Sequence, residues 1–178
     1  DLSRVAGHEV ESMNPDYCKD TSNTTLNFHN GRILSAWYNA GRVYSLDPLT
    51  LETEGEQDFA GGLDTPMNAH GKTDPRTGEF INYGYADFQP WLTYYVIGAD
   101  GSVKHRTRID LPGPRLPHDT TITPNYTILH DFPLFHDLDV LKRTGHRVVQ
   151  FMRDLPTRFG VIPRYGTQEQ VRWFEFEP

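Results

Sequence analysis

Two of the eight histidines, His70 and His118, stand where imidazole side chains can take part in metal chemistry. Each opens a segment with β-strand character and follows a small or rigid residue, Ala69 or Pro117, and the two lie 48 residues apart (118 − 70). Neutral imidazole is a good ligand for Fe, Zn and Cu. If the two segments belong to neighbouring structural repeats, their histidines can converge on one ion. A second interpretation stays open, in which each histidine is buried and satisfied by a backbone carbonyl.

Other histidines and the single cysteine carry no such pattern. His29 lies in a turn, His105 lies between charged residues of a strand, and His146 follows Gly145, so we interpret them as structural or surface residues. The sequence contains no His-x-x-x-His or Cys-x-x-Cys spacing of the kind that indicates zinc. Cys18 cannot form an internal disulfide and has no neighbouring histidine. We therefore expect it to be inert, and it does not indicate an oxidising compartment.

Short β-strands separated by turns must position these side chains. Segments rich in β-branched and aromatic residues alternate with Gly, Asp and Pro turns. The strands that we expect lie at 31–38, 79–85, 92–97, 103–109, 126–129, 148–152 and 158–163. The helix signal is limited to a turn or two at 137–143. This pattern predicts an all-β fold, which is a sandwich, a barrel or a propeller.

The spacing of His70 and His118 favours the propeller among these folds. Blade repeats run about 40–50 residues, so a chain of 178 residues corresponds to about three or four blades. That number is too small to close a ring of the usual size. In a propeller the innermost strands line the central axis, where one histidine per blade can reach a shared ion. We therefore expect residues 1–178 to form a single partial β-propeller domain that lacks its C-terminal remainder.

Composition argues against several classes of function. The chain has 17 Lys and Arg against 24 Asp and Glu, a net charge of −7, whereas a nucleic-acid partner needs a basic surface. An aromatic content of 12% is too high for a disordered chain. No stretch approaches the roughly 18 apolar residues of a membrane helix, and the first ten residues lack the profile of a signal peptide. We expect a cytoplasmic protein.

Four regions of the sequence resemble signatures of the carotenoid cleavage oxygenase family, which includes the lignostilbene dioxygenases and the retinal pigment epithelium isomerohydrolase. AHGKTDPRTGE at 69–79 is similar to the family's AHPK-DP-TGE signature, and LPHDTTITPNY at 116–126 is similar to its HDF-IT-NY signature. GRILSAWY at 31–38, followed by YSLDP and TLET, resembles its strand and LDP-TLET turn. RFGVIPR at 158–164 resembles a family strand of the same sequence. The matches occur in the family's order over roughly residues 23–178.

The resemblance implies a seven-bladed β-propeller that carries one non-haem Fe(II) on its axis, held by four histidines. His70 matches the first ligand and His118 matches the second. WFEFEP at 173–178 resembles the strand that leads to the third ligand, so the third and fourth histidines are expected beyond Pro178. The resemblance implies no catalytic residue beyond the iron ligands.

Two further positions match functional residues of the family but differ from them in type. A glutamate that accepts a hydrogen bond from an iron-bound histidine corresponds to Asn39, whose neutral oxygen donates less electron density to the ring. A lysine that binds the substrate phenol in lignostilbene-cleaving members corresponds to Tyr38, whose hydroxyl can bond a phenol or a terminal hydroxyl. Asp119, next to His118, is expected to accept hydrogen bonds from backbone amides in the turn that follows.

The implied activity is that of a dioxygenase, which uses O2 to cleave a conjugated C=C bond of an apocarotenoid or stilbene-like substrate into two carbonyl products. The expected partners are a small apolar polyene or stilbene and O2. Family members also contact membranes peripherally through apolar patches, which composition does not reveal. Two alternatives stay open: an isomerase or isomerohydrolase on the same fold, and a non-catalytic propeller that serves as an interaction module.

Overall fold

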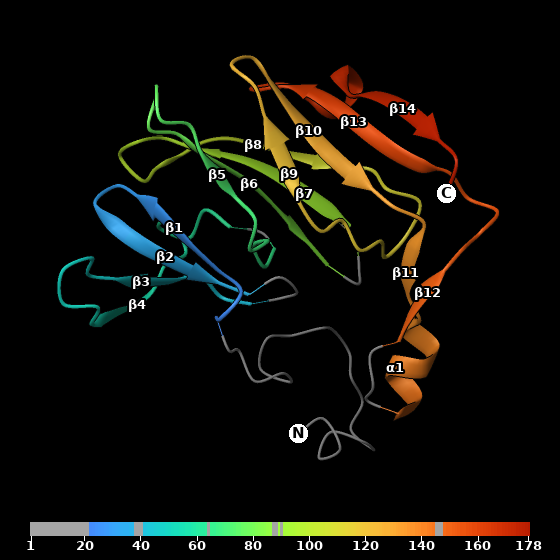
Figure 1. Ribbon diagram of the computed structural model, residues 1–178, viewed down its shortest axis with the longest axis horizontal. Helices are drawn as coiled ribbons and strands as arrows, with labels where there is room; N and C mark the ends of the chain where they lie inside the picture. Colours follow the sequence, from blue (N-terminus) through green and yellow to red (C-terminus); the bar gives the residue numbers. More distant parts are fainter. Residues whose placement is uncertain (1–21, 38–40, 64, 87–88, 90, 145–147) are drawn as a thin grey trace.

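The computed structural model describes residues 22–37, 41–63, 65–86, 89, 91–144 and 148–178. Over these residues the chain forms three four-stranded antiparallel sheets and a two-stranded hairpin (Figure 1). The first sheet contains β1 (Thr25–His29), β2 (Arg32–Ala36), β3 (Tyr44–Leu46) and β4 (Thr53–Glu56). The second contains β5 (Lys72–Thr73), β6 (Phe80–Tyr85), β7 (Leu92–Ile97) and β8 (Val103–Ile109). The third contains β9 (Thr120–Ile122), β10 (Tyr126–Asp131), β13 (Thr157–Pro163) and β14 (Arg172–Phe176), with a 3-10 turn, η3 (Gln168–Gln170), before β14.

Turn residues in the sequence account for the tight connections between strands. Asn30 and Gly31 both have positive φ, 48° and 73°, as a two-residue hairpin between β1 and β2 requires. Before β6, the Asp74 carboxylate accepts the Arg76 backbone N–H (3.0 Å). Gly78, at φ 73°, donates its N–H to the Asp74 carbonyl (2.8 Å). These local hydrogen bonds fix where each strand begins.

The second sheet lies between the other two. Every residue of β6 and β7 is buried, as expected for strands that are covered on both faces. On one face, Tyr94 belongs to an apolar cluster that includes Leu129 and Ile162 of the third sheet. On the other face, Tyr95 belongs to a cluster that includes Leu34 of the first sheet. The hydrophobic core is therefore made between sheets, each of which packs face to face on the next.

The first strand of each sheet lies at one edge, and these edge strands are neighbours. β1 contacts β5, and β5 contacts β9. The Thr73 hydroxyl of β5 donates to the Phe28 carbonyl of β1 (2.9 Å). Figure 1 shows the three sheets side by side in chain order. This is the arrangement of consecutive propeller blades, which confirms the predicted all-β, partial-propeller fold, with three blades in the described part of the chain.

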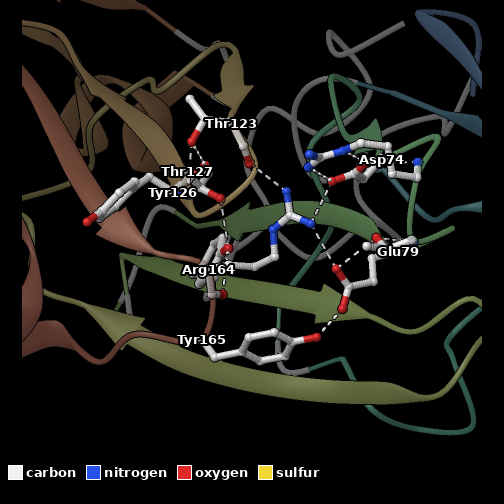
Figure 2. Close-up of polar contacts among 10 residues, drawn as sticks. Asp74, Glu79, Thr123, Tyr126, Thr127, Arg164 and Tyr165 are labelled. Carbon is white, nitrogen blue, oxygen red and sulfur yellow. Dashed lines mark hydrogen bonds and ion pairs between the residues drawn. The ribbon is translucent and has the colours of Figure 1, made fainter.

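Arg164 of the third blade forms ion pairs with two carboxylates of the second blade (Figure 2). Arg164 follows β13, and its guanidinium lies 2.7 Å from Asp74 Oδ2 and 2.9 Å from Glu79 Oε2. It also donates to the Thr123 carbonyl (2.6 Å). Hydrogen bonds from Arg76, and then from Arg164, hold the pKa of Asp74 well below its usual range. Because the charges are paired, this junction keeps an arginine that is only 7% exposed ionised.

The hairpin inserts between β10 and β13 of the third blade. It consists of β11 (Leu134–His136) and β12 (Val149–Phe151), with α1 (Leu138–Thr144) between them. The Asp137 carboxylate accepts the Val140 N–H (2.9 Å) and so caps the helix, close to the expected 137–143. In the part of the chain that the structure describes, no helix is both long and apolar enough to cross a membrane.

Candidate metal centre

His70 lies just before β5, in a segment that is held against the central strand β6. The Asn68 N–H donates to the Tyr83 carbonyl (2.8 Å), and the Asn82 side-chain amide donates to the Asn68 carbonyl (2.7 Å). Ala69 is fully buried, so the residue before the histidine is also fixed. The second blade thus determines the position of His70.

His118 lies just before β9, at the inner edge of the third blade. Three residues earlier, Arg115 places its Nε 3.0 Å from Asp131 Oδ1, and the two side chains are 2% and 0% exposed. Arg158 supplies a second cation to the same carboxylate, with Nε 2.7 Å from Oδ2. Burial is the largest influence on both partners of the first pair, and it lowers the pKa of Arg115 and raises that of Asp131. This buried cluster anchors the segment that leads to His118.

The two histidines predicted from the sequence lie together. Their ring centroids are 4.7 Å apart and the rings are inclined by 47°. His70 Nε2 is buried and makes no hydrogen bond to any residue that the structure describes, so no described carbonyl satisfies this atom. Burial lowers the pKa of His70, against an opposing pull from Asp119, and this favours the neutral imidazole that a metal requires. An unpaired buried nitrogen beside a second imidazole fits the proposed metal ligand set.

The described residues supply only part of a metal site. In residues 22–178, apart from the short undescribed gaps, no group of three or more His, Cys, Asp or Glu side chains gathers around one point. His70 and His118 stay candidate ligands, and the described residues add no third side chain of these types beside them. Zinc and iron centres usually need at least three protein ligands.

A lysine and an aspartate connect the two histidine segments next to the rings. Lys72 Nζ lies 2.7 Å from Asp119 Oδ1 and donates to the His70 carbonyl (2.8 Å). Asp119 also accepts the Thr120 N–H (2.6 Å), as expected of a carboxylate at this turn. Burial works to raise the pKa of Asp119, but the hydrogen bonds from Lys72 and Thr120 outweigh it and lower that pKa. The ion pair offsets the lysine's positive charge beside the candidate metal site.

Three other histidines have structural partners. His29 Nε2 lies 3.0 Å from the Gly98 carbonyl, and His105 Nε2 lies 2.8 Å from the Gly166 carbonyl. His130 packs against two phenylalanine rings at centroid distances of 5.2 and 5.3 Å. Burial lowers the pKa of both His29 and His130. These contacts agree with a packing role for all three.

Tyr38 and Asn39 lie outside the described residues, so their roles stay predictions. Sequence reasoning missed two residues that the structure brings to the centre, Asn68 and Lys72. A local signal was present only for Asn68, since an asparagine often accepts the backbone N–H two residues later in a turn, as Asn68 does from His70 (3.4 Å). The contacts of both residues with the third blade join distant parts of the sequence and leave no local signal.

The matches to known proteins agree with this geometry. A family model described as "Retinal pigment epithelial membrane protein" matches residues 6–178. The chain belongs to this family of carotenoid cleavage oxygenases. Carotenoid 9,10(9',10')-cleavage dioxygenase 1 from Phaseolus vulgaris is 34% identical to it over 171 residues, which cover 94% of this chain and 31% of that protein. Resveratrol cleavage oxygenase 1 from Aspergillus fumigatus is 35% identical over 164 residues, which cover 89% of this chain and 32% of that protein.

A solved structure from the carotenoid cleavage oxygenase family shows the same fold. The lignostilbene dioxygenase of Pseudomonas brassicacearum superposes with a TM-score of 0.80 at 34% identity. The superposition covers 89% of this chain and 34% of that one. The chain therefore spans about a third of the length of the relatives that it matches.

Proposed function

We propose that the protein containing this chain is a non-haem Fe(II) dioxygenase, which cleaves a conjugated C=C bond of an apocarotenoid or stilbene-like substrate. Both atoms of O2 end in the products, one in each of two carbonyl groups. The observation that carries this proposal is the position of His70 Nε2, which is buried beside the ring of His118 and has no hydrogen-bond partner among the described residues. The names of the relatives, a carotenoid cleavage dioxygenase, a resveratrol cleavage oxygenase and a lignostilbene dioxygenase, support this reaction class.

His70 and His118 would hold the metal, together with two histidines that we expect later in the sequence. Fe(II) bound by neutral imidazoles keeps its full charge and supplies the activation of O2. The protein's own residues favour the neutral form of the His70 imidazole and fix the spacing of the two rings. Burial favours the neutral ring by lowering the pKa of His70. The hydrogen bonds of Asn68 and Lys72 hold the two histidine segments at a fixed spacing.

The remaining ligands would come from further blades. On the first blade, Leu26 and Phe28 of β1 are 69% and 61% exposed. On the third blade, Phe174 and Phe176 of β14 are 51% and 56% exposed, and Phe176 adjoins an aromatic cluster around Phe159 (ring centroids 5.6 Å apart). Apolar faces of this kind normally pack on another element. They support a longer propeller that continues at both ends of this arc of blades.

Isotope labelling tests the proposed reaction. The full-length protein, loaded with Fe(II), is given 18O2 and either resveratrol or an apocarotenoid, and the products are analysed by mass spectrometry at short times. We expect cleavage with one labelled oxygen in each carbonyl product. A product of unchanged carbon skeleton that carries no label would indicate an isomerase instead. The absence of both iron binding and O2 consumption would indicate an interaction module.

Replacing Asn39 by glutamate is expected to raise the iron content of the purified full-length protein. The reason is that a carboxylate next to a ligand histidine increases the basicity of the ring more than a neutral amide does. Iron per chain, measured by plasma emission spectrometry after dialysis against a weak chelator, checks the prediction. An unchanged iron content in Asn39→Glu would contradict the position assigned to Asn39.

Tyr38, the neighbouring residue, is proposed to bind a phenol or terminal hydroxyl of the substrate. A tyrosine hydroxyl can donate to and accept from such a group. This proposal is compatible with either substrate class, since hydroxylated stilbenes and hydroxylated apocarotenoids both present the group.

A further inference from the structure

We propose that Asn68 is a positioning residue that sets the separation of the two candidate ligands, His70 and His118. This inference rests on the proposed function, because it concerns the same metal centre. The buried side-chain amide of Asn68 would join the segments of His70 and His118, which belong to the second and third blades. The hydrogen bonds of the Asn68 side chain go to the backbone of His70 and His118 and not to their rings. Asn68 would therefore act on the metal through the backbone of the two ligand segments.

The side chain of Asn68 reaches both histidine segments. Its Nδ2 donates to the His118 carbonyl (3.2 Å), and its Oδ1 accepts the His70 backbone N–H (3.4 Å). The residue is 1% exposed, so neither contact competes strongly with water. The partners are one carbonyl and one N–H, and an amide is the side-chain group that offers a donor and an acceptor at its two ends. Rotating the amide by 180° would lose both hydrogen bonds.

The backbone of Asn68 is anchored to the most buried part of the molecule. Its N–H donates to the Tyr83 carbonyl (2.8 Å), and its carbonyl accepts the Asn82 amide (2.7 Å). Tyr83 and Asn82 belong to β6, which is buried along its whole length. The Tyr83 hydroxyl in turn donates to the Asp119 carbonyl (3.1 Å), next to His118. The position of Asn68 is thus determined by the central blade, and its side chain transmits that position to the third blade.

A second connection between the same segments is more exposed. Lys72 joins the His70 carbonyl to the Asp119 carboxylate, but the side chains of Lys72 and Asp119 are 37% and 44% exposed. Ion pairs with this much solvent contact contribute little. We therefore expect Asn68 to carry more of the positioning than Lys72.

Metal binding by the full-length protein tests this inference. Co(II) replaces Fe(II) as the probe, because its visible d–d bands report the geometry of the ligands. Asn68→Ala is expected to weaken Co(II) binding by about 10- to 100-fold, as loss of a group that orients metal ligands typically does, and to shift the d–d bands. Asn27→Ala is the matched control. It removes an asparagine amide that donates to the Ala69 carbonyl, next to His70 (3.3 Å), and that belongs to the first blade rather than to the junction with the third. We expect it to change the affinity less than about twofold.

Asn68→Asp keeps the test decisive if the alanine variant does not fold, because aspartate has nearly the same shape. It retains the acceptor for His70 but places an oxygen against the His118 carbonyl, so it is also expected to weaken Co(II) binding and shift the bands. Affinity and spectra equal to those of the wild type in a folded Asn68 variant would overturn the positioning role alone. A wild-type protein that binds neither Co(II) nor Fe(II) would overturn the proposed function, and the positioning role with it.

Discussion

Replacing His70 by alanine in the full-length protein is expected to abolish iron binding and O2-dependent cleavage together. Its Nε2 is buried and has no hydrogen-bond partner among the described residues, as expected of a nitrogen that coordinates a metal. Loss of groups that merely orient a ligand costs about 10- to 100-fold. Loss of a ligand itself should therefore exceed about 100-fold in affinity. His118→Ala should have the same effect, because its ring lies 4.7 Å away.

The comparison with His105→Ala separates a metal-binding role from a general loss of structure. His105 lies in β8, at the edge of the second sheet opposite β5, and its Nε2 bonds the Gly166 carbonyl (2.8 Å). We expect His105→Ala to keep its iron content and its O2 uptake. Iron per chain and O2 uptake are measured on all three variants, with thermal unfolding as the check on folding. Full iron content in His70→Ala, with the protein folded, would contradict the assignment.

Replacing Gly84 by alanine is expected to destabilise the protein and to reduce iron binding as well. Gly84 lies in β6 and forms an antiparallel bridge with Met67, where the segment that leads to His70 runs alongside the strand. A Cβ at Gly84 would lie 1.9 Å from Thr65 Oγ1 and 2.4 Å from the Pro66 carbonyl oxygen. The hydroxyl can rotate away, but the carbonyl belongs to the backbone, so the segment itself must move. Overpacking of a core in this way typically costs about 1–3 kcal/mol.

A lower iron affinity of the folded protein distinguishes Gly84→Ala from a variant that is only less stable. Gly61→Ala is a suitable control, since a Cβ there meets nothing within 4 Å and the cost is limited to backbone strain at φ 74°. We expect both variants to unfold at lower denaturant concentration, but only Gly84→Ala to lose iron affinity while still folded. Equal iron affinity in folded Gly84→Ala and wild type would show that the bridge between Gly84 and Met67 does not position His70.

Local sequence patterns predicted the strands that carry strong propensity. The expected strands at 92–97 and 103–109 coincide with β7 and β8. Val, Ile, Tyr and Thr dominate β7, β8 alternates less exposed side chains with exposed charged ones, and an Asp-Gly turn separates the two strands. β4 was harder to predict, since its sequence, TEGE, has almost no apolar side chain. Its pairing with β3 is determined by the sheet rather than by its own residues.

The sequence was enough to predict the two candidate ligands, but not the residues that hold them in position. Spacing and motif resemblance singled out His70 and His118, and the structure brings them together. The role of Asn68 depends on the contact between residues 68 and 118, which are 50 positions apart, and no local pattern reports such a contact. The Arg115–Asp131 pair was missed for the same reason, because only the folded blades show that both charges are buried.

Anomalous X-ray diffraction at the iron absorption edge, from crystals of the full-length protein grown with Fe(II), tests the central claim most directly. The account predicts one anomalous peak within bonding distance of His70 Nε2 and of the His118 ring. A peak bound elsewhere, with these two imidazoles hydrogen-bonded to backbone or solvent instead, would contradict it.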